Sequence, residues 1–438
     1  MQSNIDSFYP NLYSCFENVE DHRNQINIQI KLPDILMSGF AMFSLKDRSL
    51  LKFTNQYRIR GNNLRTIYGI NKLPSDTSMR QVIDKVDSKE LQPILGSLVK
   101  RLIQENHLTR HEVLKGYLYI PIDGTDYFSS QKVNCKKCLI TNHQNGTVSY
   151  RHKGLVATLV HPEQREVFPV AIEAIIKQDG ETKNDSELAA SYRLFPSIKK
   201  ALPPMQPTII GGDAIFSCAN FLKQVSEYDW DFLLTIKEGN QPFPFTQFEK
   251  LLKSGKVNRV KKVNHSKNRK YIYQYVNDLI LNEANPDIKV NFLRYQEIDL
   301  ETGEILKEFN WITSIEINNR NVKKLVATGR SRWKIENETF NTLKNQGYEF
   351  EHNFGHGKEH LSDNFAILML LAFLIDQTAQ RLDKDFKKAW ITVKTKIDLW
   401  EMIRRYFDMV NCKSMNTIYK IIAGEIRIKI QIEDFDGS

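Results

Sequence analysis

The order of strand-like and helical segments in the middle of the chain restricts its possible folds strongly. Three early segments are rich in β-branched and aromatic residues, as strands typically are. These segments are residues 117–122, 155–160 and 167–176. A helical pattern over 186–202 follows, then an apolar strand at 208–210, a helix from Ser217 and a further strand at 231–236. The sequence therefore predicts an α/β protein.

Three strands followed by helix, strand, helix and strand is the order of a ribonuclease-H-like core, which we place at residues 113–345. Alternating apolar and polar residues predict a β-rich insertion domain that interrupts this core at 242–318. Helical patterns flank the core and predict an N-terminal helical region at 1–112 and a C-terminal helical region at 346–438.

An apolar run at residues 365–375 is too short to cross a bilayer, so it predicts a buried core helix, with Ser362 and Asp363 as its cap. The N-terminal residues are polar and acidic where a signal peptide is basic and then apolar, so we expect a cytoplasmic protein. Lys and Arg outnumber Asp and Glu by 61 to 52, a net charge of +9. This balance favours a polyanionic partner without identifying it, since many soluble proteins are equally basic.

Three carboxylates from separate segments are candidates for phosphoryl-transfer chemistry. Two Mg²⁺ ions held by carboxylates can activate an attacking oxygen and stabilise a leaving oxygen during phosphodiester cleavage. Asp123 follows the first strand and Asp213 the fourth, and these strands are neighbours in the expected order. Glu336 lies one helical turn after Arg332 and shares its helix face. Each carboxylate also has an ordinary interpretation: a turn residue, a helix cap and a helical ion pair, respectively.

Six stretches spread over nearly the whole chain form a recognisable set. They are Pro74-Ser75-Asp76-Thr77 with Met79-Arg80, Asp123-Gly124-Thr125, Gln178-Asp179-Gly180 with Lys183-Asn184-Asp185, Gly212-Asp213, Lys237 with Asn240-Gln241, and Arg332-Trp333-Lys334-Ile335-Glu336-Asn337. Together they resemble the DDE transposases of bacterial insertion sequences, in the IS-four-like branch with a β-rich insertion. The resemblance implies that Asp123, Asp213 and Glu336 are catalytic and bind two Mg²⁺ or Mn²⁺ ions. It also implies that Arg332 contacts a DNA phosphate, and it adds Lys237 to the DNA-contacting residues.

Two positions depart from the signature of that family, which has a Tyr three residues before the Arg and a Lys seven residues after the Glu. Here these positions are Gly329 and Leu343, and we expect the adjacent Lys344 to contact DNA instead. A helical step rotates a side chain by roughly 100°. Lys344 would therefore need a local distortion of the helix, or a different DNA path, to take this role. The helix itself should bury an apolar stripe that includes Trp333 and Phe340.

Further DNA contacts are expected in the insertion. Trp311 resembles the tryptophan on which some family members stack a flipped base during hairpin formation; the alternative is a core aromatic on a strand. Lys261, Lys262 and Arg269 belong to a basic stretch that could grip phosphates, and a solvated charged loop is the alternative.

Five cysteines, an odd number spread along the chain, predict thiols or a metal site rather than a disulfide framework. Cys135 and Cys138 with His143 and His152 offer two thiolates and two imidazoles, which is a possible ligand set for a structural Zn²⁺. A reduced loop with incidental thiols is the alternative.

The resemblance implies a DNA transposase that cleaves double-stranded DNA at transposon ends and transfers the strands to target DNA by cut and paste. It also implies that the helical region at 1–112 binds the transposon ends, and that the protein associates with the bacterial nucleoid when bound to DNA. Because two ends must be held together, we expect a homodimer. Trp390, Leu399, Trp400 and Ile403 are a possible interface, with packing inside the chain as the alternative. A different class is also open: a domesticated regulatory protein that keeps the fold and binds DNA without transposing it.

Overall fold

The computed structural model describes residues 5–24, 26, 28–176 and 185–429. The chain forms two compact units, Leu95–Asn341 and the combination of Met1–Ile94 with Thr342–Ser438. Of the six stretches that suggested a family, Gln178-Asp179-Gly180 and Lys183-Asn184 lie outside the described residues. The structure is mixed α/β, as the sequence predicts.

The unit Leu95–Asn341 is built on a large sheet whose first half follows the predicted order of elements. Its strands are β1 (Glu112–Leu114), β2 (Tyr117–Ser130), β3 (Leu139–Asn142), β4 (Val148–Leu159), β5 (Phe168–Ile175), β6 (Thr208–Gly212) and β7 (Asp231–Thr235). The helices α7 (Glu187–Ala201) and α8 (Ala219–Glu227) connect β5 to β6 and β6 to β7. The expected succession of three strands, helix, strand, helix and strand is therefore confirmed.

Adjacent strands of this sheet bring the middle of β2 beside the end of β6. The sequence placed Asp123 after the first strand, but β2 continues to Ser130, so Asp123 lies within it. β4 pairs with both β2 and β5 in antiparallel fashion, whereas β2, β6 and β7 are parallel neighbours. Pro121 of β2 lies opposite Gly211 of β6. Asp123 and Asp213 each come two residues further along, just beyond the point where the pairing of β2 with β6 ends.

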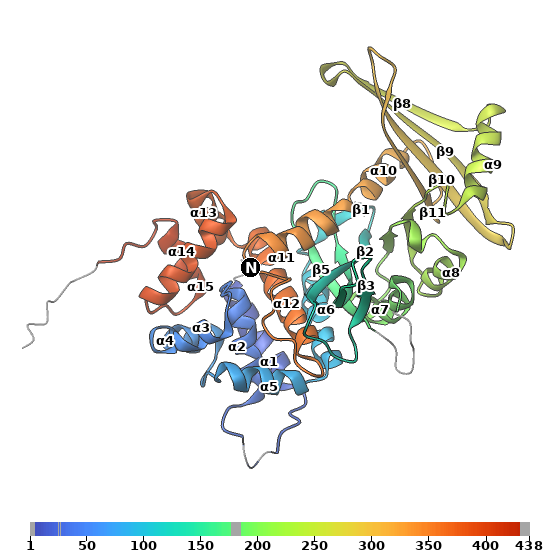
Figure 1. The fold of residues 1–438 in the computed structure, drawn as a ribbon. Coiled ribbons are helices and arrows are strands. Elements are labelled where there is room, and N and C mark those ends of the chain that lie inside the picture. The colour runs from blue at the N-terminus through green and yellow to red at the C-terminus, as the bar shows by residue number, and fades with distance from the viewer. Residues whose placement is uncertain (1–4, 25, 27, 177–184, 430–438) are drawn as a thin grey trace, which may run out of the picture. The chain divides into compact units, whose positions relative to one another are not determined.

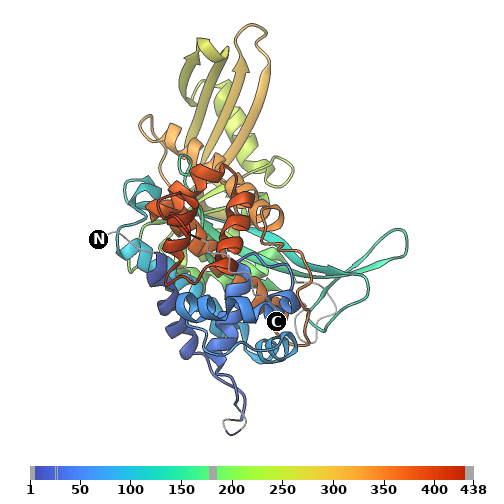
Figure 2. The ribbon, with the colours of Figure 1, turned by 90° about the vertical axis from the view of Figure 1, so that its left-hand side faces the viewer.

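The insertion extends this sheet rather than forming a separate one. Its strands are β8 (Asn258–Asn264), β9 (Arg269–Asn282), β10 (Asn285–Asp299) and β11 (Ile305–Thr313). β11 pairs with β7, which gives the continuous order β3-β4-β2-β6-β7-β11-β10-β9-β8 (Figure 1 and Figure 2). The predicted β character is thus confirmed.

The insertion also contains a helix that the alternating pattern did not predict. This helix, α9 (Pro242–Lys253), lies against the long strands (Figure 1). Phe245 and Phe248 point from it onto Phe292 of β10, with ring centroids 5.1 and 4.5 Å apart. Because these rings recur at helical spacing, their burial against the sheet fixes the helix.

A distorted helix follows the insertion. α10 (Val322–Arg330) ends in a turn, and a π-helix, η6 (Ile335–Phe340), comes next, followed by α11 (Asn341–Asn345). Phe340 and Leu343 are buried as predicted, but Trp333 is 45% exposed. The expected apolar stripe is therefore wrong at Trp333, because the turn before η6 breaks the regular helical period.

The other unit is helical and draws on both ends of the chain. Its N-terminal helices are α1 (Phe8–Glu17), α2 (Leu32–Ser44), α3 (Leu50–Asn55), α4 (Tyr57–Tyr68) and α5 (Asp76–Lys85), while α6 (Ser88–Gln104) leads out of it. Its C-terminal helices are α12 (Leu361–Leu382), α13 (Lys384–Val393), α14 (Lys396–Met409) and α15 (Met415–Ile422). α12 packs on α2 and α5, so the two chain ends share one core.

The helix α12 holds the long apolar run. It has 22 residues and is long and apolar enough to cross a membrane, so the expectation that the segment is too short was wrong. Nearly all of it is buried in the helical unit, with 89% of its most apolar window covered, which confirms the expected buried helix.

The first turn of α12 is capped by a residue far away in the sequence. The Asp84 carboxylate of α5 accepts hydrogen bonds from the backbone N–H groups of residues 358–361 at 2.9–3.0 Å. Ser362 and Asp363 lie inside the first turn, so the expectation that they cap this helix was wrong. Burial favours the neutral form of Asp84, but these four hydrogen bonds outweigh it and lower the pKa of this carboxyl.

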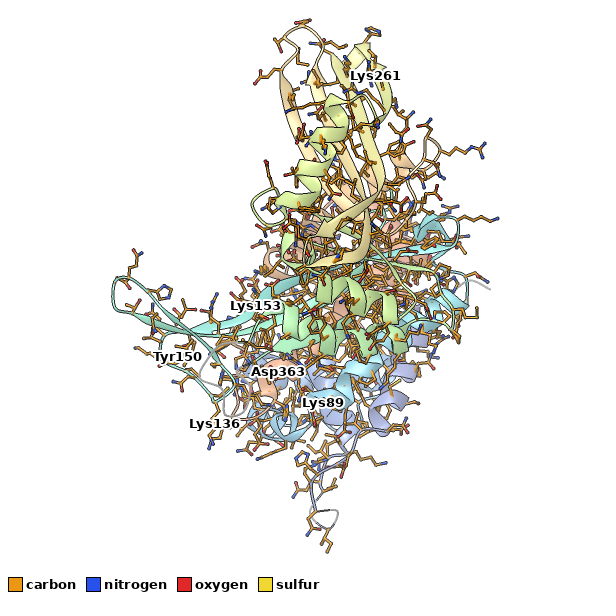
Figure 3. The ribbon with its side chains drawn as sticks, turned by 90° about the vertical axis from the view of Figure 1, so that its right-hand side faces the viewer. Lys89, Lys136, Tyr150, Lys153, Lys261 and Asp363 are labelled. Carbon is orange, nitrogen blue, oxygen red and sulfur yellow. The ribbon has the colours of Figure 1, made fainter. Side chains whose placement is uncertain are left out.

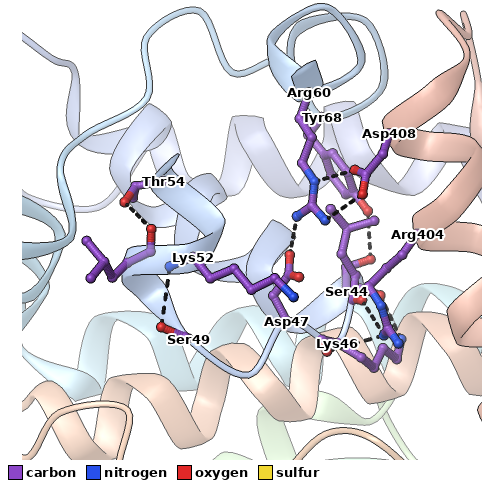
Figure 4. Close-up of polar contacts among 12 residues, drawn as sticks. Ser44, Lys46, Asp47, Ser49, Lys52, Thr54, Arg60, Tyr68, Arg404 and Asp408 are labelled. Atoms are coloured by element: carbon purple, nitrogen blue, oxygen red, sulfur yellow. Dashed lines mark hydrogen bonds and ion pairs between the residues drawn. The ribbon is translucent and has the colours of Figure 1, made fainter. Parts of the chain in front are cut away.

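Buried ion pairs join α4 to α14 within the same unit (Figure 4). Arg60 pairs with Asp47 and places its Nε 2.5 Å from Oδ1 of Asp408. Arg404 donates to the carbonyl oxygens of Leu45 and Lys46 at 3.1 and 3.3 Å. Every charge of the Arg60 group thus has a partner, as buried charges require.

Three of the four residues considered as a dimer interface belong to this core. Leu399, Trp400 and Ile403 of α14 are buried within the unit. These side chains therefore take the alternative role of packing inside the chain.

Candidate active site

Arg332 links two of the three predicted catalytic carboxylates. Its Nη1 lies 3.0 Å from Oδ2 of Asp123, and its Nη2 lies 3.5 Å from Oε1 of Glu336. The second oxygen of Asp123 accepts the backbone N–H of Gly124 at 2.9 Å. The ion pair expected between Arg332 and Glu336 is thus present, and it is part of a larger arrangement centred on Asp123.

Asp123 is the most perturbed acid of this site. Burial raises the pKa of Asp123 to about 6, and the Arg332 guanidinium opposes this increase. The negative charges of Glu336 and Glu187 raise the pKa further, while the Gly124 N–H lowers it. The Arg332 guanidinium therefore does not fully offset the effect of burial on Asp123.

Asp213 lies at the end of β6, beside β2. Its Oδ1 accepts the backbone N–H of Ile215 at 3.0 Å, so it caps the short helix η4 (Ala214–Phe216), and its side chain is exposed. The cap interpretation is therefore correct. It is compatible with a second role, because a carboxylate has further lone pairs for a ligand.

Glu336 lies within the π-helix η6 and is exposed. A π turn adds one residue to a helical turn and often occurs at functional sites. Lys334, just before η6, is buried and donates to the carbonyl oxygens of His161, Pro162 and Gln164 at 2.8, 3.0 and 2.5 Å. This lysine fixes the start of the helical segment that carries Glu336.

A second ion pair lies close to Asp123 and was not foreseen. Lys153 of β4 places Nζ 2.5 Å from Oε1 of Glu187, at the start of α7. A Cβ added at Gly124 would come within 2.4 Å of the Glu187 carboxylate, so a larger residue there would displace the Lys153–Glu187 ion pair. The Asp123-Gly124 pair was the available signal, but sequence periodicity does not show which side chain approaches a glycine.

A cavity of about 620 Å³ adjoins Arg332. Lys237, Trp311 and Trp333 line it, together with Gly329. Trp311 is only 2% exposed and stacks on Phe309 at 5.7 Å, whereas Trp333 is 45% exposed. Trp311 thus has the burial of a core aromatic while one face borders the cavity. Trp333 offers the larger accessible surface.

Gly329 has a packing reason for departing from the expected tyrosine. A Cβ at this position would lie 2.7 Å from Nε1 of Trp311, closer than any normal contact. A tyrosine at Gly329 would therefore collide with the buried indole.

The insertion holds a second cavity of about 590 Å³, lined by basic and aromatic side chains. Lys262 and Arg269 line it, and Arg269 also pairs with Asp299 at 2.7 Å. Lys261 and Lys262 are exposed on the edge strand β8, where Figure 3 labels Lys261. Edge strands often carry lysines that prevent sheet-to-sheet pairing, so exposure alone does not assign a DNA contact.

An aromatic row runs across β9, β10 and β11 between these cavities. Tyr271 stacks on Tyr295 at 6.3 Å, Tyr295 on Phe309 at 6.4 Å, and Phe309 on Trp311 at 5.7 Å. Arg330 lies 5.5 Å from the Tyr295 ring and borders both cavities. The row connects the basic insertion to the surroundings of Arg332.

The donor set at the candidate site suits a hard divalent cation. Asp123, Asp213 and Glu336 offer only carboxylate oxygens, which Mg²⁺ and Mn²⁺ prefer. Burial is the main reason that the pKa of Asp123 is raised, and the carboxylates of Glu336 and Glu187 raise it further. A bound cation would stabilise the ionised form of this buried carboxyl, so these residues fit a metal site.

Acidic residues on adjacent parallel strands or directly after them, with a third acid on a later helix, suit metal-dependent chemistry on phosphodiesters. The sequence profile of the family described as "Transposase DDE domain" matches residues 142–374, more than half of the 438 residues. The chain belongs to this family of DDE transposases. The matched range includes Asp213 and Glu336, and Asp123 precedes it. A comparison with curated proteins finds no match.

Proposed function

We propose that this chain is a cut-and-paste transposase of an insertion sequence, in the IS-four-like branch, whose catalytic residues are Asp123, Asp213 and Glu336. The alignment of Asp123 and Asp213 on neighbouring parallel strands carries the proposal. The strand order of β5, β4, β2, β6 and β7 supports a ribonuclease-H-like core.

In this proposal the three carboxylates hold two Mg²⁺ or Mn²⁺ ions. When bound, these ions activate the attacking oxygen and stabilise the leaving oxygen. Arg332 contributes a fixed positive charge between Asp123 and Glu336 and is placed to contact the phosphate that is cut. Lys153 and Lys334 hold neighbouring elements in place through the contacts described above.

We also assign Lys344 the role of the lysine that the family has seven residues after its glutamate. The π-helix η6 (Ile335–Phe340) contains Glu336 and adds one residue to the turn that leads toward Lys344. With this extra residue, the eighth residue after Glu336 points in the direction that the seventh would have in a regular α-helix. This is the local distortion that the role requires.

The DNA path we propose follows the aromatic row of the insertion toward Arg332. Bases can stack on aromatic faces while basic side chains contact phosphates. Trp333 is the exposed stacking surface in this arrangement, and Lys237 borders the same cavity.

A strand-cleavage assay tests the proposed chemistry. The substrate is linear DNA carrying the sequences that flank the coding sequence, incubated with Mg²⁺. Asp213→Asn should lower cleavage at least about 100-fold, because a metal-binding carboxylate is removed. Asp229→Asn is the matched control, since Asp229 is an exposed acid in a left-handed conformation that asparagine also tolerates.

Equal cleavage by Asp213→Asn and the unchanged protein would exclude the mechanism. Absence of cleavage by the unchanged protein, with retained DNA binding, would favour the regulatory alternative. In the same assay Lys344→Ala should reduce cleavage while Lys324→Ala, on an exposed face of α10, should not.

A further inference from the structure

The loop after β2 brings two cysteines and a histidine together away from the three catalytic carboxylates. The Sγ atoms of Cys135 and Cys138 lie 3.8 Å apart, and Nε2 of His152 lies 3.4 Å from the Cys135 Sγ. The three ligand atoms all lie within 4.8 Å of one another. From these distances we propose that Cys135, Cys138 and His152 bind a structural Zn²⁺.

The separations match those around a tetrahedral zinc ion. Zn–S bonds of about 2.3 Å and Zn–N bonds of about 2.0–2.1 Å place two sulfurs roughly 3.8 Å apart, and a sulfur and a nitrogen roughly 3.6 Å apart. The structure gives 3.8 and 3.4 Å for these two distances. A disulfide would need sulfurs about 2.05 Å apart, so this pair is not one.

The local backbone has the form of a ligand-bearing turn. The N–H of Cys138 donates to the carbonyl oxygen of Cys135 at 3.2 Å, which closes a tight turn between them. The N–H of Cys135 lies 3.3 Å from the Sγ of Cys138, a contact that stabilises a thiolate. Cys138 and His152 are buried, and thiolate and imidazole together favour zinc over Mg²⁺.

His143 does not join this group, which corrects the predicted ligand set. Its Nε2 lies 2.7 Å from Oγ of Ser149, and the residue is exposed near the hairpin tip. The structure thus brings together three of the four predicted zinc ligands. A zinc ion would complete its tetrahedral coordination with a fourth nitrogen or oxygen ligand from elsewhere.

The site would tie the loop to the strand that pairs with the catalytic strand. Phe128 of β2 lies opposite His152 of β4, and Asp123 lies opposite Val156 in the same ladder. Figure 3 labels Lys136 in the loop between the cysteines and Tyr150 on β4. Zinc would anchor the far end of the ladder that carries Asp123.

Metal analysis of the purified full chain, prepared without added chelator, tests the proposal. We expect about one zinc per chain, and X-ray absorption should show two sulfur and two nitrogen or oxygen ligands. The double variant Cys135→Ser/Cys138→Ser should retain less than about a tenth of that zinc. His143→Ala and Asp213→Asn should keep it, because neither removes a proposed ligand.

A second measurement covers the case in which the double variant fails to fold. In the unchanged protein, a zinc chelator should speed tryptic cleavage at the exposed Lys132 and Lys136 at least about tenfold, and added Zn²⁺ should reverse the effect. Absence of zinc after purification and after incubation with Zn²⁺ would overturn the proposal. Zinc retained by a folded double variant would overturn it as well.

Discussion

Two tryptophans beside Arg332 differ in how much of their surface DNA could reach. Trp311 is 2% exposed and Trp333 is 45% exposed, although both line the same cavity. The sequence indicated the opposite assignment, because Trp311 matches a family motif and Trp333 falls in an apparent apolar stripe. The exposure of Trp333 depends on the turn before η6, and the periodicity of the sequence does not predict that turn.

Replacing each tryptophan with alanine should therefore have different effects. Trp311→Ala should destabilise the fold by about 3–5 kcal/mol, as is usual for a buried large aromatic. Trp333→Ala should change stability little and weaken binding of flank DNA by about 1–3 kcal/mol if a base stacks there. Urea unfolding and fluorescence anisotropy separate the two quantities. Unchanged DNA affinity in Trp333→Ala would refute the stacking role.

The titration of Asp123 predicts how pH affects the metal-free protein. Its pKa is about 6 in the folded state against an ordinary value of 3.8. Between these values the native state binds a proton that the unfolded state lacks, so this group lowers stability as pH rises. Asp123→Asn removes this effect. The free energy of unfolding of the variant, relative to that of the unchanged protein, should therefore increase by at most about 3 kcal/mol from pH 4 to pH 7.

Urea unfolding at several pH values, in the presence of a chelator, measures this difference. Glu336→Gln is the useful comparison, because it removes one charge that raises the Asp123 pKa and should move the transition to lower pH. A stability difference that does not change with pH would contradict the titration of Asp123.

Among the elements, strands were predicted well and helix boundaries less well. Strands β2, β4, β5, β6 and β7 contain runs of apolar and β-branched residues. Such runs favour a strand directly, so the sequence was enough to predict them. Helix α9 was missed because it lies in a region interpreted through its alternating neighbours. The cap of α12 was misassigned because Asp84 is remote in sequence, and a local pattern cannot reveal a partner of that kind.

Lys334 allows a test of how the Glu336 segment is positioned. Lys334→Met should lower the free energy of unfolding by at least about 2 kcal/mol, since three carbonyl oxygens are left without their donor. It should also reduce the thermal stabilisation that Mg²⁺ gives, because Glu336 is no longer held in place. Lys324→Met, at an exposed position of α10, controls for the removal of a lysine. A full Mg²⁺ effect in Lys334→Met would count against a positioning role.

For the molecule as a whole, the sequence predicted which helices and strands are present better than which of them pack together. Helical patterns at both chain ends were evident, but periodicity cannot show that α12 packs on α2 and α5. The three candidate carboxylates were proposed from their order along the chain and from the resemblance to a family. Arg332 was proposed from that resemblance and from its place one turn before Glu336, whereas Glu187 and Lys153 depend on tertiary proximity.

The net charge of +9 and the basic edge strand predict a salt-dependent interaction with DNA. Replacing Lys261 and Lys262 with glutamine should weaken binding to all DNA sequences and reduce the salt slope by about one for each phosphate that is no longer neutralised. Lys223→Gln, on α8, is a control with an equally exposed lysine. Binding measured from low to moderate salt gives the slope. A slope that stays the same would assign these lysines to protection of the sheet edge.

The pairing of β11 with β7 has a mechanical consequence. A domain joined through flexible linkers could move independently. Here β11 and β7 share a hydrogen-bond ladder, and β7 pairs with β6, the strand that precedes Asp213, so the insertion moves together with this part of the sheet. The spacing between a DNA segment held on the insertion and the point of cleavage is then set by strand geometry, at roughly 3.3 Å per residue. The length of the strands would then set the distance between the bound DNA segment and the cleavage site. Lengthening β11 should therefore displace the cut along the DNA rather than abolish it.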